Sequence, residues 1–325
     1  MMAGKRILSV GAPLIDLLAQ VDDSFLQKVG GAKGGMEHCT SEELQSYLRE
    51  CDKYEIVTGG AAGNTIFMLA RLGQQCAMLG MTGSDKFGRI YRDTFAKYGG
   101  STEYLFESDT PNGACLALIT PDSERTMRSC LAASLEINAS MVEAVDFSKF
   151  DVVYIECYAI FNQEYFEAVI RAAKAAGCEV AIDLGSFEIV EMFRERMKAL
   201  VEGEADIILA NEDEARALFG DLPAGEMLGR LAEHAKVAVL KLGKNGSMIC
   251  SGNEVYRIEA PIVEAIDTTA AGDIWAAGFF YGYLNDRPLD ECGKYGSLLA
   301  AEVVQIIGSQ IPEQRLDALR GKLEF

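Results

Sequence analysis

Short apolar runs alternate with longer amphipathic runs through most of the chain, and this alternation restricts the fold more than any other feature. The short runs, as in "RILSVG", "QCAMLGMTG" and "VAVLKLG", are typical of buried strands. The longer runs, such as "QEYFEAVIRAAKAAG", carry apolar residues at helical spacing. Strands and helices in this order predict an α/β fold, a three-layer α/β/α core in which a mostly parallel sheet is covered by helices on both faces.

Two segments interrupt the alternation, residues 12–40 and residues 104–130. Both contain extended stretches, such as "GACLALIT", that are bounded by turn residues. We expect them to pair into a small antiparallel sheet at the edge of the core, where it can serve as a lid. The sequence contains no internal repeat and no Pro/Ser-rich linker, so residues 1–325 are predicted to form a single domain that carries this lid.

Charge limits the partners of the chain. The 30 Lys and Arg residues stand against 49 Asp and Glu residues, a net charge of −19 that repels nucleic acid and anionic membrane surfaces. Pro13 and Asp16 interrupt the first apolar stretch before it could form a membrane span. We therefore expect no nucleic acid and no membrane as partner. A phosphorylated metabolite can still bind, because helix N-termini, local lysines and Mg²⁺ act over a few ångströms.

The sequence lacks the motifs of zinc sites, serine hydrolases, Walker-type NTPases and Rossmann dehydrogenases. The nine cysteines form no C-x-x-C pair and no cluster with histidine, so we expect buried free thiols in a reducing cytoplasm rather than zinc. His38 and His234 have no triad partners nearby, and G-x-S-x-G is absent. No G-x-x-x-x-G-K-[ST] occurs, and the first strand–helix junction, "GAPLID", lacks G-x-G-x-x-G. Walker-type NTPases and Rossmann dehydrogenases are therefore disfavoured.

The seven residues "DTTAAGD", 267–273, precede a long apolar run that is predicted to be a helix. A helix N-terminus offers unpaired N–H groups and a partial positive charge, so the amides of Ala270, Ala271 and Gly272 can bind an anion. Asp273 would lie in the first turn, where it can accept a proton from a hydroxyl beside that anion. In the alternative interpretation, Asp273 only stabilises the helix N-terminus and the alanines pack against the sheet.

A second loop of small residues, "TGGAAGN" at 58–64, also opens a predicted helix. Its glycines permit positive φ and close approach of the backbone to a ligand. The alternative is a tight turn in which Asn64 is an ordinary polar residue of the first helical turn. Ligands of open parallel sheets bind at the carboxyl ends of the strands, where both loops are expected.

Taken together, these motifs resemble the ribokinase-like (PfkB) family of carbohydrate and nucleoside kinases. That family combines a glycine pair and a nearby asparagine with Asp-Thr-Thr-Gly-Ala-Gly-Asp near the C-terminus. Here the two motifs are "GGAAGN" and "DTTAAGD", and "GSDKFG", "NEDEA" and "KLGKNG" follow the family's order between them. The resemblance covers nearly the whole chain and implies a ribokinase-like fold and a kinase that uses ATP and Mg²⁺.

The resemblance also implies roles for individual residues. Asp273 matches the catalytic base, which takes the proton of the acceptor hydroxyl as this attacks the γ-phosphate. Asp267, with the chain near Ile307 and Gly308, matches a monovalent-cation site, which predicts activation by K⁺. The other matches are the anion hole, Ala270, Ala271 and Gly272; the acceptor-binding positions, Asp16, Gly60 and Asn64; the ATP-binding positions, Asn211, Lys241, Gly243 and Gly246; and Glu214, which organises Mg²⁺ through water.

The acceptor is not fixed by the resemblance. The stretch "GACLALITPDSERTM" and the motif "YIECY" look like the adenosine-kinase-like branch of the family. Position 12, however, is alanine where many relatives have asparagine. The candidate acceptors are therefore adenosine, another ribonucleoside, or a free sugar such as ribose or fructose.

Ala270 stands where the family usually has glycine, and this keeps a second class of function open. If φ is positive there, alanine costs about 1 kcal/mol and its methyl group can crowd a phosphate. A positive φ would therefore favour a non-catalytic regulator that binds a nucleoside or sugar. A third class, a cofactor-dependent oxidoreductase, lacks its dinucleotide motif. Exposed lid strands are natural pairing edges, so both a monomer and a homodimer through the lid are compatible with the sequence.

Overall fold

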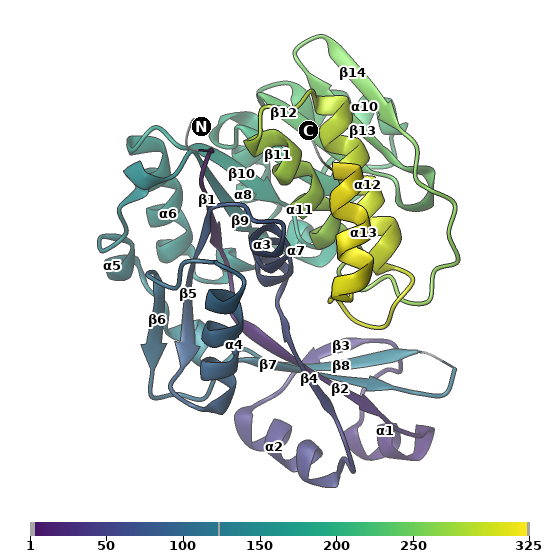
Figure 1. Ribbon diagram of the computed structural model, residues 1–325. Helices are drawn as coiled ribbons and strands as arrows, with labels where there is room; N and C mark the ends of the chain where they lie inside the picture. Colours follow the sequence, from purple (N-terminus) through teal and green to yellow (C-terminus); the bar gives the residue numbers. More distant parts are fainter. Residues whose placement is uncertain (1–3, 123, 324–325) are drawn as a thin grey trace.

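The computed structural model describes residues 4–122 and 124–323, which form two separate sheets (Figure 1). From β12 to β6 every neighbouring pair in the large sheet is parallel, and β13 and β14 extend it as an antiparallel pair. The strands of the large sheet, in spatial order, are β14 (Glu254–Ile258), β13 (Ser247–Ser251), β12 (Val237–Lys241), β11 (Ile207–Asn211), β10 (Glu179–Asp183), β9 (Val152–Glu156), β1 (Ile7–Val10), β5 (Cys76–Gly83) and β6 (Leu105–Ser108).

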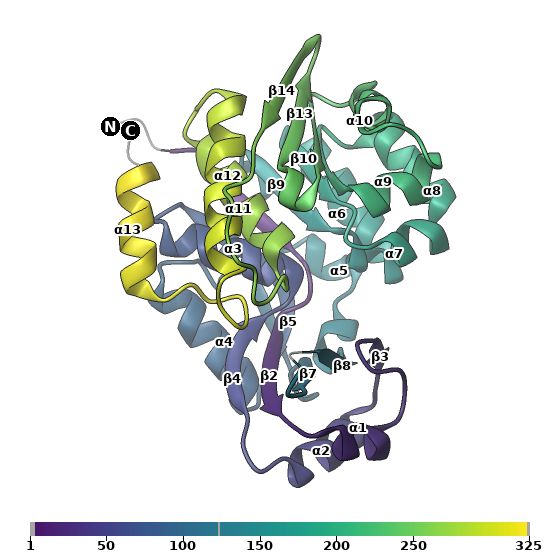
Figure 2. The same ribbon diagram turned by 90° about the vertical axis from the view of Figure 1, so that its right-hand side faces the viewer.

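Helices cover both faces of the large sheet, as the alternation predicts (Figure 2). One face carries α3 (Ala61–Arg71), α4 (Lys86–Lys97), α11 (Ala271–Leu284), α12 (Leu289–Val303) and α13 (Glu313–Leu323). The other face carries α5 (Ala139–Val142), α6 (Gln163–Ala175), α7 (Phe187–Met192), α8 (Arg194–Ala199), α9 (Glu212–Phe219) and α10 (Ala224–Ala232). Successive strand residues belong to opposite cores, Ile7 to the first and Leu8 to the second. Because both faces are buried, the strands are continuous apolar runs rather than alternating ones.

The small sheet forms where the two interrupting segments pair, and it lies at one end of the molecule with α1 (Asp23–Val29) and α2 (Ser41–Glu50) beside it (Figure 1). Its strands, in spatial order, are β3 (Met36–His38), β8 (Arg125–Cys130), β7 (Ala114–Ile119), β2 (Leu14–Gln20) and β4 (Glu55–Gly59).

Three details of the small sheet differ from the prediction. The sheet is mixed rather than antiparallel, because β2 pairs in parallel with β7 and β3 with β8. β2 and β7 follow β1 and β6, which run in the same direction in the large sheet, so they leave it in the same direction. The first segment extends beyond residue 40, since β4 pairs with β2. The second begins later than residue 104, since β6 belongs to the large sheet.

The cysteines follow the expectation of free, mostly buried thiols. All nine cysteines are free thiols, and seven of them are buried. Within the described ranges, no group of histidine, cysteine and acidic side chains is arranged to hold a metal ion. Over the same ranges, every helix is too short or too polar to cross a lipid bilayer.

Candidate functional site

The N-terminus of α11 carries Asp273 and contacts the N-terminus of α3. The side-chain amide of Asn64 donates a hydrogen bond to Asp273 Oδ2 (2.9 Å), and the Thr65 hydroxyl donates to the Asp273 carbonyl oxygen (3.0 Å). Burial raises the pKa of the Asp273 carboxyl to about 7, although the hydrogen bond from Asn64 opposes this shift. The two small-residue loops therefore meet, and they hold a carboxyl group that can exchange a proton near neutral pH.

The turn before α11 is left-handed. Ala270 is the N-cap of the helix and has φ 60° and ψ 7°. The turn brings the amide of Ala271 to the Thr268 carbonyl, to which it donates (3.2 Å). The amides of Ala270, Gly272 and Asp273 have no acceptor within the described part of the chain. The amides open to an anion therefore differ from the predicted set by one residue. The Ala271 amide is already bonded within the chain, and the Asp273 amide is open instead.

Lys241, at the end of β12, brings a positive charge to this turn. A Cβ atom on Gly272 would lie only 3.4 Å from Lys241 Nζ, so the amine is next to the backbone of the turn. The same amine pairs with Asp183 Oδ2, at the end of β10, at 2.9 Å. Burial lowers the pKa of Lys241, but the carboxylates of Asp183 and Glu214 outweigh this effect and raise it overall. A charged ammonium group therefore adds to the positive end of α11.

Asn211 and Glu214 form the N-terminal capping box of α9. Asn211 Oδ1 accepts from the Glu214 amide (2.9 Å), and Glu214 accepts from the Asn211 amide (2.8 Å) and side chain (2.6 Å). Burial raises the pKa of Glu214 to about 7, with Lys241 opposing the shift. Because these bonds occupy the carboxyl oxygens, the pair fits a Mg²⁺ ion held through water and phosphate oxygens better than one ligated directly.

Glu156, at the end of β9, is a buried carboxyl that the motif analysis did not assign to the site. Its Oε1 accepts from the Ala12 amide (2.9 Å) and its Oε2 from the Ala62 amide (2.6 Å). Burial raises the pKa of Glu156 to about 7, and the two amides oppose the shift. Glu156 therefore joins the turn after β1 to the first turn of α3, which carries Asn64.

These groups surround a central cavity of about 190 Å³. Four carboxyl groups and one amine give it a strongly polar wall, unlike the cavities on either side. Its lining residues are Ala61, Tyr154, Glu156, Asp183, Gly185, Asn211, Glu214, Lys241, Thr268, Ala270, Ala271, Gly272 and Asp273.

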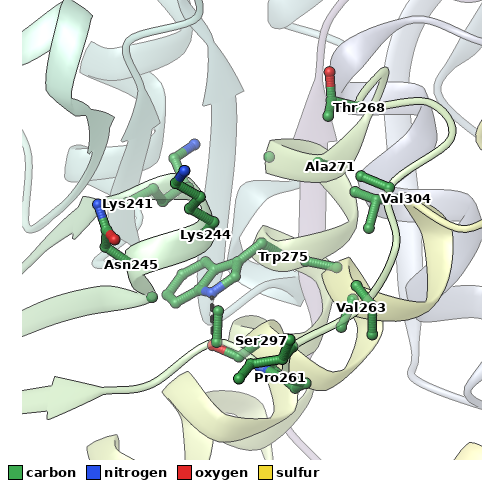
Figure 3. Close-up of a pocket in the computed structure, with 18 residues that line it drawn as sticks. Lys241, Lys244, Asn245, Pro261, Val263, Thr268, Ala271, Trp275, Ser297 and Val304 are labelled. Carbon is green, nitrogen blue, oxygen red and sulfur yellow. Dashed lines mark hydrogen bonds between the residues drawn. The ribbon is translucent and has the colours of Figure 1, made fainter.

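A helix-side cavity of about 500 Å³ lies beside the central cavity and shares Lys241, Thr268, Ala271 and Gly272 with it (Figure 3). The Trp275 indole occupies the middle of the close-up, and its Nε1 donates to Ser297 Oγ (3.4 Å). The apolar part of the wall comes from α11, α12 and the loop before α11, namely Ala260, Pro261, Ile262, Val263, Ala265, Trp275, Ala300, Ala301 and Val304. This composition suits a flat, largely apolar ring with polar groups that extend toward Lys241.

Gly243 and Gly246 line the same cavity. Gly246 has φ 87°, and a Cβ atom there would lie 1.9 Å from the Ile258 carbonyl oxygen, so only glycine fits this turn after β12. The glycines of the "KLGKNG" segment thus shape the wall beside Lys241.

A sheet-side cavity of about 310 Å³ lies on the other side and shares Ala61 and Glu156 with the central cavity. Asp16, Gly60 and Asn64, the predicted acceptor-binding residues, all line it. Burial raises the pKa of Asp16 to about 7, and Arg125 opposes the shift. Most of the remaining wall is apolar, with Leu14, Met36, Met127, Leu131, Leu135, Ile137 and Phe161.

Arg125 of β8 connects the small sheet to the turn before α11. One guanidinium nitrogen lies 2.8 Å from Asp267 Oδ2, and another donates to Thr269 Oγ1 (3.0 Å). Asp267 also accepts from the amides of Thr269 (3.0 Å) and Gly308 (2.7 Å). The carboxylate predicted to hold a monovalent cation is therefore bonded to groups of the chain itself.

The structure brings all but one of the predicted site residues to the walls of the three cavities. Asp267 lies outside these walls and forms an ion pair with Arg125. His38 lines the sheet-side cavity, whereas His234 lies on a separate surface groove. Arg125, Glu156 and Asp183 were not predicted, and only Glu156 belongs to a stretch, "YIECY", that the motif comparison had noticed.

Comparison with known proteins supports one family. The model for pfkB family carbohydrate kinases matches residues 36–315. The solved structure of a probable sugar kinase from Rhizobium etli CFN 42 superposes with a TM-score of 0.88 at 30% identity, covering 99% of this chain and 100% of that one. Adenosine kinase from Sinorhizobium meliloti has a TM-score of 0.87 at 31% identity, covering 98% and 100%. A ribokinase from Haemophilus influenzae is 27% identical over 79% of this chain and 84% of its own.

Proposed function

Because the chain belongs to the PfkB family of carbohydrate kinases, we propose that it transfers the γ-phosphoryl group of ATP to the hydroxymethyl group of a nucleoside, with a sugar as the second candidate. The observation that carries the proposal is the position of Asp273. It lines the central cavity, between a cavity suited to a nucleotide base and one suited to an acceptor.

In this proposal, Asp273 takes the proton of the acceptor hydroxyl. The acceptor oxygen forms a bond to the γ-phosphorus, and the bond from that phosphorus to the β–γ bridging oxygen breaks, which releases ADP. The amides of Gly272 and Asp273, with Lys241, stabilise the charge on the phosphoryl oxygens. One backbone donor of this kind contributes about 3 kcal/mol to a transition state.

Mg²⁺ would enter with the phosphates of ATP and neutralise part of their charge. Asn211 and Glu214 would hold it through water, as their mutual hydrogen bonds suggest. Asp183 lies on the same wall and keeps Lys241 in place.

A nucleoside is favoured over a free sugar by the wall of the sheet-side cavity. Asp16 and Asn64 are suited to the hydroxyl groups of a ribose, since a carboxylate and an amide can each bind vicinal hydroxyls. The apolar wall beyond them suits a heterocyclic base, whereas it would leave further sugar hydroxyls without partners. The small sheet would act as the lid over this acceptor, joined to the turn before α11 by Arg125.

The test is ADP release over a panel of nucleosides and sugars, including adenosine, ribose and fructose. We expect Mg²⁺-dependent turnover with a nucleoside as the preferred acceptor. Trp275 is the only tryptophan, so its fluorescence reports nucleotide binding at the helix-side cavity independently of turnover. Nucleotide binding without turnover of any acceptor would contradict the proposal.

A non-catalytic regulator is the second candidate, and the left-handed Ala270 is the observation that favours it. Its strain of about 1–2 kcal/mol is small beside the contribution of the retained groups. Asp273, Lys241 and the open amides together support catalysis, because a protein that only binds needs no base near neutral pH.

Three further expectations belong to this proposal. K⁺ activation requires an ion near Asp267 in addition to Arg125. Equal activity in Na⁺ and K⁺ buffers would contradict this expectation. A homodimer would use the edge strands β3 or β4 of the small sheet, and a monomer is the alternative; sedimentation separates the two. The free thiols support a reducing, cytoplasmic environment.

A further inference from the structure

The chain passes between the large and the small sheet four times, and hydrogen bonds join these passages in pairs (Figure 1). In chain order the passages are residues 11–13, Gly60, residues 109–113 and Leu131. Glu156 joins the first passage to the second, because it accepts from the amides of Ala12 and Ala62. The Ala133 amide, just after the fourth passage, donates to the Pro111 carbonyl oxygen in the third (3.1 Å).

Asn112, in the third passage, connects these two pairs. It is 3% exposed, and its side-chain amide donates to the carbonyl oxygens of Pro13 (3.1 Å) and Gly113 (2.8 Å). Its Oδ1 accepts from the amide of Gly83 (3.0 Å), the last residue of β5. Both hydrogens of the side-chain amide are therefore used within the chain. One buried side chain thus ties the first passage, the third passage and the large sheet together.

The bonds of Asn112 fix the start of the strand that carries Asp16. The Gly113 carbonyl accepts from the Asn112 side chain and also from the amide of Ile15 (3.0 Å), where the parallel pairing of β2 with β7 begins. Asp16 is the next residue of β2. Its carboxyl group lies against Gly59, where a Cβ atom would come within 2.3 Å of it. The position of the Asp16 carboxyl relative to the large sheet therefore depends on the bonds of Asn112.

Asn112 is not itself part of the site, because it lines none of the three cavities. It connects the strand of Asp16 to β5, a strand of the large sheet. Asp273 and Lys241 belong instead to α11 and β12, elements of the large sheet and its helices. The bonds of Asn112 therefore affect where the acceptor-binding carboxyl lies and leave the nucleotide side in place.

We propose that Asn112 is a positioning residue of the acceptor site. Through Pro13 and Gly113 it holds the start of β2, and so the Asp16 carboxyl, in the position that binds the acceptor hydroxyls. This inference rests on the proposed function, because it takes Asp16 as a ligand of the acceptor.

The test measures turnover of adenosine and of ribose by Asn112→Ala and Asn112→Thr at pH 8, above the pKa of about 7 of Asp16. We expect Asn112→Ala to raise the KM for the acceptor about tenfold, the effect of one weakened hydrogen bond to a charged group. The KM for ATP should stay within about twofold, and kcat should fall less than about threefold. Asn112→Thr keeps one donor and one acceptor, so a smaller rise is expected, and it provides the comparison if Asn112→Ala does not fold.

Asp16→Asn tests whether Asn112 acts through Asp16. If it does, adding Asn112→Ala to Asp16→Asn should change the KM for the acceptor less than about twofold, because the group that Asn112 positions is already impaired. Two independent effects would multiply instead. A multiplied KM in the double variant would overturn the inference.

Gln74→Ala is the matched control. Gln74 is 7% exposed, and its side chain donates to the Lys5 carbonyl oxygen (2.5 Å) and accepts from Asn285 (3.0 Å), away from the three cavities. Both alanine variants should lower the Tm, because each leaves polar groups without a partner. Only Asn112→Ala should raise the KM for the acceptor. Equal rises in the two variants, or no rise in Asn112→Ala, would contradict the proposed role.

Calorimetric titration separates this inference from the proposed function. If the wild type binds adenosine or ribose without turnover, the kinase proposal fails, and a dissociation constant about tenfold larger in Asn112→Ala still supports the inference. If the wild type phosphorylates either acceptor and Asn112→Ala has an unchanged KM, the kinase proposal stands and the inference fails.

Discussion

The helix-side and sheet-side cavities lie on either side of Asp273 but are built in different ways. The wall of the helix-side cavity comes from residues 241–304, one continuous part of the chain between β12 and the end of α12. The wall of the sheet-side cavity comes from positions between Gly11 and Thr269 and includes strands of both sheets. The first therefore needs only the large sheet and its helices, whereas the second needs the small sheet to be held against them. A change of acceptor can thus arise in the small sheet without disturbing the nucleotide side.

The largest effect is expected from replacing the proposed catalytic base, Asp273, which lies between the two cavities. Asp273→Asn should lower kcat about 10²–10⁴-fold, because the amide cannot accept the proton. Binding at both cavities should persist, with Trp275 fluorescence reporting ATP and calorimetry reporting the acceptor. Asp290→Asn, at a partly exposed acid of α12 that pairs with Lys294, is the control and should leave kcat unchanged. Near-normal turnover in Asp273→Asn would exclude Asp273 as the base.

The second prediction concerns Arg125, whose removal should weaken acceptor binding more than ATP binding. Arg125→Ala leaves the buried Asp267 carboxylate without its cation and should lower the free energy of unfolding by about 3 kcal/mol. Since Arg125 belongs to the small sheet, the KM for the acceptor should rise about tenfold or more, while the affinity for ATP changes less than about threefold.

Arg125→Lys and Arg257→Ala are the matched variants for this prediction. Lysine keeps the charge but cannot bond Asp267 and Thr269 in the same geometry, so an intermediate effect is expected. Arg257 lies on the edge strand β14 and is exposed, so its removal should be neutral. Equal losses of ATP and acceptor affinity in Arg125→Ala would show that the cavities are not independent.

The third prediction concerns pH and follows from where the acids lie. Asp16, Glu156, Glu214 and Asp273 each have a pKa raised by burial to about 7, and each lines the central or the sheet-side cavity. Among the described residues, none of the acids lines the helix-side cavity. Because Asp273 must be ionised to act as a base, kcat/KM should rise up to about tenfold per pH unit below pH 7 and level off above it.

The free energy of unfolding should fall as the pH rises, whereas kcat/KM should increase. These carboxyls bind protons more tightly in the folded than in the unfolded chain, so their contribution is complete below about pH 4 and is lost as the pH rises through about 7. Each group contributes at most about 1.4 kcal/mol per pH unit within that window. Urea unfolding of the ligand-free protein at pH 5 and pH 8 measures the change. Asp273→Asn should make the difference in unfolding free energy between pH 5 and pH 8 smaller. A protein that is more stable at pH 8 than at pH 5 would contradict the raised pKa values.

The large sheet and the local motifs around Asp273 and Lys241 could be predicted from the sequence, whereas the acceptor side could be predicted less well. Strands buried on both faces are continuous apolar runs, so the large sheet was predictable from the pattern alone. The residues around Asp273 and Lys241 lie in short motifs, because a helix N-terminus and a tight turn are local structures. The acceptor-binding roles of Asn64 and Asp16 came only from the family resemblance.

Arg125, Glu156 and Asn112 could not be predicted from local pattern. Arg125 meets Asp267 across 142 positions, and Glu156 meets Ala12 across 144, so their pairing depends on how the two sheets come together. Asn112 appears in the sequence as an ordinary polar residue of a turn, and only the folded chain shows which three backbone groups it joins. The mixed pairing of the small sheet depends likewise on strand directions inherited from the large sheet.

The smallest expected effect concerns Ala270, at the central cavity where the two sides meet. Its left-handed φ of 60° costs about 1–2 kcal/mol relative to glycine. Ala270→Gly removes this strain but gives the unfolded chain more freedom, which offsets about 0.4–1 kcal/mol. We therefore expect a gain of about 0.5–1 kcal/mol in the free energy of unfolding and an unchanged kcat, since the amides stay in place.

Ala271→Gly is the matched control, because Ala271 starts the helix without a positive φ. Glycine there brings only the entropic cost and should destabilise by about 0.5–1 kcal/mol. The two neighbouring substitutions should therefore shift the urea midpoint in opposite directions. A rise in kcat of tenfold or more in Ala270→Gly would mean that the alanine methyl group obstructs the phosphoryl group, and that this turn, rather than either cavity, limits the reaction.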